Sequence, residues 1–196
     1  MSERRASTGA AAKEVTVGDE QEGNPDTDWG PARTKTVTWH DPMVNATAAT
    51  SLSGLDFLYA VQDGALPRPP IAQLMGFTLV EVGPGLAVFE CTPDESLYNP
   101  IGVVHGGLVC TLSDSAAGCA VQTSLEAGVA YTSIDINVTY LRPVTKDSGL
   151  IRAIGRLTKP GRKVAYATVE VTDRVGKMLA QATSSCLVMD NRKPSE

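Results

Sequence analysis

The residues best suited to chemistry are a carboxylate and a glycine on one predicted helix. Asp114 can serve as a general base or as a nucleophile. Gly106 falls at the predicted start of that helix, where unpaired N–H groups and the helix dipole favour negative charge. Eight residues separate the two, or about 12 Å along a helix at 1.5 Å per residue. Because both groups cannot reach the same reacting atom within a single chain, this spacing predicts that a site using both is shared between two copies.

The helix that carries Asp114 is predicted from Leu108 to about residues 125–128, a stretch without proline. Its apolar residues recur at a spacing of three and four, which indicates one buried face: Val109, Leu112, Ala116, Cys119 and Ala120. Asp114 lies about 200° around the helix from Leu112 and Ala116, so it points away from that face. Small residues surround it there, and we expect this second face to pack against another subunit: Cys110, Ala117 and Val121.

The remaining elements are short helices and strands that position this helix. Helices are predicted at 53–64 and 71–75, and strands at 77–82, 86–92, 133–140, 150–158, 163–173 and 178–189. Short Gly- and Pro-containing turns follow several strands and predict antiparallel neighbours. One antiparallel sheet curled around one long helix, an α+β arrangement, is the economical solution.

The strand after the helix shows the clearest alternation in the chain. One predicted face carries Ile134, Ile136, Val138 and Tyr140. The opposite, polar face carries Ser133, Asp135, Asn137 and Thr139.

Composition limits the class of protein and its organisation. The chain has 196 residues and a formal net charge of -5, and it contains no apolar run of the roughly 18 residues needed to span a bilayer. We therefore expect a cytoplasmic protein, with residues 1–50 as a disordered or loosely docked extension, 51–190 as the folded domain and 191–196 as a polar tail. Four scattered cysteines and two histidines, without the paired short spacing of metal ligands, argue against a dedicated zinc site.

A longer pattern around the helix resembles a known family. Asn99-Pro100-x-Gly102-x-x-His105-Gly106-Gly107, followed by Asp114, resembles the hotdog-fold acyl-CoA thioesterases of the phenylacetate-pathway (PaaI-like) type. The resemblance extends to Thr139-Tyr140-Leu141-Arg142-Pro143 and covers about residues 55–188.

The resemblance implies a fold, an activity and site residues. The fold would be a sheet wrapped around the central helix, in homodimers with shared active sites that commonly pair into tetramers. The reaction would be hydrolysis of acyl-CoA, with no cofactor because CoA is part of the substrate. Asp114 would be nucleophile or general base, and the Gly106 N–H would polarise the carbonyl. The remaining residues implied to line the site are His105, Asn99, Gly107, Ser133 and Thr132.

Phosphate groups of CoA call for cations, and the acidic chain has a local basic excess between Arg142 and Lys163. Arg142, Lys159, Arg162 and Lys163 are therefore predicted to bind the nucleotide end of the substrate. No nucleic-acid or membrane partner is expected from the charge balance.

Several alternatives remain open at this stage. His105 and Asn99 can be turn-forming residues only, and Cys110 or Cys119 can be considered as nucleophiles. A non-catalytic acyl-CoA binding or sensor protein would use the same fold, although the first 50 residues show no helix-turn-helix pattern. A hotdog hydratase would need an Asp and a His about five apart, whereas His105 and Asp114 are nine apart. Acyl carrier protein thioesters are an alternative to CoA thioesters, and the acyl group is not specified.

Overall fold

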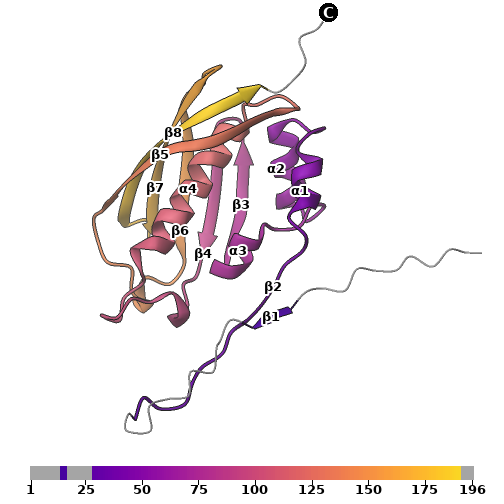
Figure 1. The fold of residues 1–196 in the computed structure, drawn as a ribbon. Helices are drawn as coiled ribbons and strands as arrows, with labels where there is room; N and C mark the ends of the chain where they lie inside the picture. Colours follow the sequence, from indigo (N-terminus) through magenta and orange to yellow (C-terminus); the bar gives the residue numbers. More distant parts are fainter. Residues whose placement is uncertain (1–13, 17–27, 191–196) are drawn as a thin grey trace, which may run out of the picture.

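A six-stranded antiparallel sheet curls around one long helix, α4 (Gly106–Gln122), in the computed structural model, which describes residues 14–16 and 28–190 (Figure 1). The sheet order is β3-β4-β6-β7-β8-β5. Its strands are β3 (Phe77–Gly83), β4 (Leu86–Cys91), β5 (Val129–Tyr140), β6 (Ile151–Lys159), β7 (Val164–Asp173) and β8 (Met178–Asp190). This is the predicted α+β architecture.

Two short helices precede the sheet, as the sequence predicts. Helix α2 (Gly54–Gln62) begins after Ser53, whose hydroxyl accepts a hydrogen bond from the Asp56 N–H. Helix α3 (Pro70–Met75) ends at Gly76, which has a φ of 71° and so adopts the left-handed conformation that glycine favours.

The part before residue 50 contains further regular structure. Helix α1 (Met43–Ala48) precedes α2, and β1 (Glu14–Thr16) pairs with β2 (Thr36–Thr38) in a small separate sheet (Figure 1). Short 3₁₀ turns lie at Glu95–Leu97 and Lys146–Ser148. Residues 1–13 and 17–27 of the extension predicted to be disordered or loosely docked, and the polar tail 191–196, lie outside the described residues.

Helix α4 is more deeply buried than its apolar pattern indicates. Ala117 and Val121, predicted to face another subunit, are both 0 % exposed within this single chain. Their burial arises because strands β4 to β8 all contact the helix and α2 packs against it as well. The prediction of a free second face for these two residues is therefore wrong.

The sheet order was only partly predictable. The short turns do make β3–β4, β6–β7 and β7–β8 antiparallel neighbours. However, β5 pairs with β8, and β4 pairs with β6, across long stretches of chain. Strand β5 is consequently an edge strand, with one side unpaired in this single chain.

A β-bulge in β5 corrects the predicted alternation. Ser133 pairs with Cys186 and Asp135 pairs with Ser185, so Ile134 is an extra residue. Ile134 is 56 % exposed, whereas Ile136 and Val138 pack against the core. Since the bulge shifts the alternation by one, Ser133 faces α4 and not the predicted polar face.

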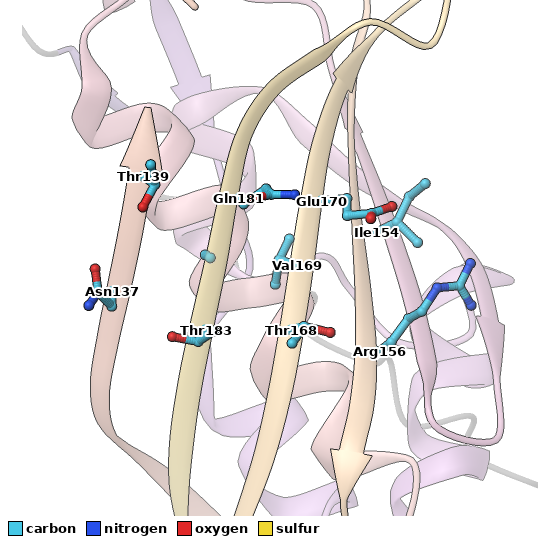
Figure 2. Close-up of a pocket in the computed structure, with 10 residues that line it drawn as sticks. Asn137, Thr139, Ile154, Arg156, Thr168, Val169, Glu170, Gln181 and Thr183 are labelled. Atoms are coloured by element: carbon cyan, nitrogen blue, oxygen red, sulfur yellow. The ribbon is translucent and has the colours of Figure 1, made fainter. Parts of the chain in front are cut away.

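The outer face of the sheet is polar. Figure 2 shows Asn137 and Thr139 of β5 on this face, beside Gln181, Thr183 and Thr168, with α4 behind the strands. These residues line a shallow hollow of about 510 Å³. Among the described residues, no helix is long and apolar enough to cross a membrane.

Candidate active site

The middle of α4 and the start of β5 form the first half of the site. The Ser133 hydroxyl donates a hydrogen bond of 2.8 Å to Oδ1 of Asp114. Oδ2 of Asp114 accepts no hydrogen bond from the described residues. The carboxylate is therefore oriented by one oxygen and keeps the other available to a water or substrate.

The N-terminus of α4 forms the second half. Nδ1 of His105 accepts a hydrogen bond of 2.8 Å from the Gly107 N–H, and the His105 carbonyl accepts from Leu108 at 3.0 Å. The Gly106 N–H, in contrast, donates to no acceptor within residues 14–16 and 28–190. His105 thus caps the next amide and leaves the Gly106 N–H as a free donor at the positive end of the helix.

Tyr140 covers Gly106 from the far end of β5. Its hydroxyl donates a hydrogen bond of 3.0 Å to the Gly106 carbonyl. A Cβ at position 106 would lie 3.1–3.2 Å from the Tyr140 ring, so glycine permits this close approach. Gly106, Tyr140 and Arg142 line one cavity of about 310 Å³. We did not assign Tyr140 a role from the sequence, although it lies in the Thr139–Pro143 stretch that carries part of the resemblance.

Asn99 shapes the loop that leads into the helix. Its Oδ1 accepts hydrogen bonds from the N–H groups of Ile101 and Val103, at 3.1 and 3.2 Å. Its own N–H donates to the Val103 carbonyl at 2.8 Å. These contacts give Asn99 the turn-forming function considered above. The side-chain Nδ2 makes no hydrogen bond with the described residues, so it remains available to a substrate.

The two halves do not meet within one chain. Asp114 contacts β5 at Ser133, whereas Gly106 contacts it at Tyr140, seven residues further along the strand. Along α4 the same two residues are about 12 Å apart. A single chain therefore holds a carboxylate and a free amide donor at opposite ends of one contact between helix and strand.

A group of polar residues fixes the bulge beside Ser133. The Ser184 hydroxyl donates to the Asp135 carbonyl at 2.8 Å, and the Ser185 N–H donates to the Asp135 carboxylate at 3.3 Å. The Ser185 hydroxyl also donates to that carboxylate. We did not recognise these three residues from the sequence, because their shared role depends on the cross-strand register of β5 and β8.

The surroundings of Cys119 make its thiol an unfavourable nucleophile. Burial, followed by the charge of Asp114, raises the pKa of the Cys119 thiol to about 12. Burial also raises the pKa of the Cys186 thiol. A thiol with a raised pKa stays protonated near neutral pH and is a poor nucleophile.

The predicted phosphate-binding residues fall into two separate places. Arg142 follows β5 beside Gly106, and its guanidinium donates to the Met178 carbonyl at 2.6 Å. Arg162 and Lys163 lie in the exposed turn between β6 and β7. This turn is at the Ser133 end of β5: the Val188 N–H donates to the Lys163 carbonyl, and Val188 pairs with Tyr131. Lys159 lies over the Tyr166 ring, 5.7 Å from its centre.

The other predicted residues have simple positions. Thr132 is exposed and, next to Ser133, faces the opposite side of β5 from Asp114. Gly107 lies beneath His105, where a Cβ would lie 2.9 Å from Nδ1. In the part of the chain that the structure describes, no group of three or more His, Cys, Asp or Glu residues could hold a metal ion.

Comparison with known proteins supports the resemblance. The profile of the Thioesterase superfamily matches residues 101–180. Over 105 residues the chain is 33 % identical to human acyl-coenzyme A thioesterase 13. The matched region covers 53 % of this chain and 74 % of the human protein. The chain belongs to the thioesterase superfamily. It is a PaaI-like thioester hydrolase with the hotdog fold that its sequence implies.

Solved structures agree with this family. A phenylacetic acid degradation-related protein from Ralstonia eutropha JMP134 superimposes with a TM-score of 0.61 and 28 % identity, over 66 % of this thioesterase and 98 % of that chain. The PaaI protein of E. coli gives a TM-score of 0.60 over 70 % of this chain and 95 % of its own. At 20 % identity, the second likeness supports the fold alone.

Proposed function

We propose that this thioesterase hydrolyses acyl-CoA to a free carboxylic acid and CoA, with each active site built from two chains. The observation that carries the proposal is the pair of complementary unsatisfied groups on α4. Asp114 has a carboxylate oxygen without a partner, and Gly106 has an N–H without an acceptor, among the described residues. The name of the human relative, an acyl-coenzyme A thioesterase, supports the choice of CoA as the carrier.

The proposed chemistry uses these two groups on one thioester. The Gly106 N–H donates to the carbonyl oxygen and stabilises the negative charge that develops when the carbonyl is attacked. Asp114 either removes a proton from an attacking water or attacks the carbonyl itself to give an anhydride that water then hydrolyses. In both routes the C–S bond breaks, the sulfur leaves as thiolate and takes up a proton, and the acid is released. Ser133 orients the carboxylate through Oδ1.

A two-fold pairing of β5 edges would bring the halves together. The unpaired side of β5 is 12 residues long and can pair antiparallel with the same strand of a second chain. Pairing about the middle of the strand places the Ser133 end of one chain beside the Tyr140 end of its partner. Asp114 would then face Gly106 of the partner subunit. Pairs of such dimers would form the expected tetramer.

The same symmetry would unite the two groups of basic residues. Arg142 lies at the Gly106 end of β5, and the turn with Arg162 and Lys163 lies at the Ser133 end. Ten residues from Thr132 to Arg142 span about 33 Å in a strand, so one chain cannot use both groups on one nucleotide. Across the dimer both groups would flank one substrate, which suits the phosphates of CoA.

The test is release of free thiol from a panel of short, long and aromatic acyl-CoAs, with binding of each measured in parallel. We expect turnover of at least one class. Binding of acyl-CoA without thiol release from any substrate would overturn the proposal in favour of a sensor or binding protein. Release from acyl carrier protein thioesters alone would overturn the choice of carrier.

A further inference from the structure

We propose that Tyr131 sets the length of the acyl group, because it separates the Asp114–Ser133 pair from an uncharged cavity beyond it. This inference rests on the proposed function and adds the class of acyl group to it. The argument follows the contact between α4 and β5 away from Asp114, in the direction opposite to Gly106.

The first step is the alignment of two pairs of residues. Gly118 is one helical turn beyond Asp114 on the same side of α4, and Tyr131 is two residues before Ser133 on the same side of β5. A Cβ at position 118 would lie 2.6 Å from the Tyr131 hydroxyl and 2.8 Å from Cε2 of its ring. The Tyr131 side chain therefore packs directly on the backbone of α4, immediately beyond the reacting pair.

The surroundings of Tyr131 also keep its hydroxyl protonated. Burial, followed by the nearby Cys119, Cys186 and Asp114, raises the pKa of Tyr131 well above its usual value. The hydroxyl thus stays neutral, and the ring forms an apolar wall beside the carboxylate.

The second step is a cavity on the other side of this wall. It has a volume of about 480 Å³ and lies between α1, the end of α4 and the start of β5. Tyr131 itself lines it, together with Gln122, Val129, Ala46 and Ala49. All of its lining residues are uncharged, and many are small. Such a lining suits a hydrocarbon chain and offers no cation to the phosphates of CoA.

The third step concerns the distance along α4 from Asp114 to the Tyr131 ring. Four residues separate Asp114 from Gly118, or about 6 Å along the helix axis. An acyl group that extends along α4 from a carbonyl at Asp114 therefore meets the Tyr131 ring after about this distance, which matches a short chain or a single ring. A longer chain would meet the Tyr131 ring before it reached the cavity. The structure therefore assigns the wild-type protein short or aryl acyl groups as substrates.

The experiment is a profile of kcat/KM against acyl length, from two to sixteen carbons with phenylacetyl-CoA included, for the wild type and Tyr131→Ala. We expect wild-type kcat/KM to fall about tenfold or more for chains of ten carbons and longer. Tyr131→Ala should raise kcat/KM for these chains by about tenfold or more, because the added methylenes gain a buried place.

Three further variants separate cavity access from other effects. Tyr131→Phe keeps the ring and should keep the wild-type length limit. Tyr131→Ala combined with Ala49→Leu fills the opened cavity and should restore that limit. Tyr59→Ala, the same change at an exposed tyrosine of α2, should not shift the profile. Tyr131→Leu replaces Tyr131→Ala if the alanine variant does not fold.

A folded Tyr131→Ala or Tyr131→Leu variant with the wild-type length profile would overturn the inference, as would efficient wild-type turnover of long chains. Acyl-CoA affinities measured against chain length in Asp114→Asn provide a second readout that needs no turnover. If the wild type releases thiol from none of the substrates, the proposed function is contradicted. If thiol is released but Tyr131→Ala and Tyr131→Leu keep the wild-type length profile, only the role of Tyr131 is contradicted.

Discussion

Two aspartate–serine pairs each include one residue of strand β5, and they differ in whether a carboxylate oxygen lacks a hydrogen bond. Asp114 of α4 accepts one hydrogen bond, from Ser133, and its second oxygen has no partner among the described residues. Asp135 of β5 accepts from Ser185 through both the backbone N–H and the hydroxyl, on separate carboxylate oxygens. The two pairs have the same residue types within a few residues of each other, yet only one keeps an oxygen available.

In the proposed function, this difference separates the reacting group from a positioning group. Asp135, Ser184 and Ser185 hold the bulge at Ile134, and the bulge turns Ser133 toward α4. The Asp135 carboxylate, which accepts hydrogen bonds on both oxygens, therefore shapes the strand. The Asp114 carboxylate, which accepts on one oxygen, is the one that can act on a substrate. Matched Asp→Asn changes at the two positions test this comparison, since they alter charge at nearly constant size.

The largest effect is expected from Asp114→Asn. The amide oxygen can still accept from Ser133, so folding and thermal stability should stay close to those of the wild type. Loss of the base or nucleophile should lower kcat by about 10³-fold, within the range found for general bases. Thiol release from the best acyl-CoA, with circular dichroism and size-exclusion chromatography as controls, measures it. A loss of less than tenfold would remove Asp114 from the chemistry.

A smaller effect on activity, and a larger one on stability, is expected from Asp135→Asn. The neutral amide loses the charge-assisted contacts to Ser185, which should lower the free energy of unfolding by about 1–2 kcal/mol. Tm should fall by a few degrees for a chain of this size. Activity should fall less than tenfold, because the bulge relaxes without loss of Asp114. An activity loss as large as that of Asp114→Asn would contradict the distinction between the two pairs.

Local features of the fold were predictable because local chemistry determines them. Ser53 caps α2, Gly76 ends α3, and turn residues after the strands make adjacent strands antiparallel. The pairing of β5 with β8 was not predictable, because the two strands are far apart in the sequence and no short turn joins them. Burial of Ala117 and Val121 likewise depends on how far the sheet curls.

The candidate site shows the same division. The motif located Asp114, Gly106 and His105, and the resemblance supplied their expected roles. Alternation alone placed Ser133 on the wrong face, because a one-residue bulge reverses the alternation and needs the register with β8 to be seen. Tyr131 was not recognised because its position against Gly118 joins residues from two elements.

The central claim, that each active site takes Asp114 from one chain and Gly106 from the other, is tested by complementation between inactive variants. Asp114→Asn removes the carboxylate, and Gly106→Val places bulk at the amide and against the Tyr140 ring. Chains with the two changes, carrying different tags, are expressed together, and the mixed dimer is purified through both tags.

If the site is shared across the two-fold axis, one site of the mixed dimer contains both changes. The other site contains neither change and keeps both Asp114 and Gly106. The activity of the mixed dimer should then reach about half that of the wild-type dimer, while each parent stays inactive. A mixed dimer no more active than its parents would show that Asp114 and Gly106 act within one chain, and it would contradict the account.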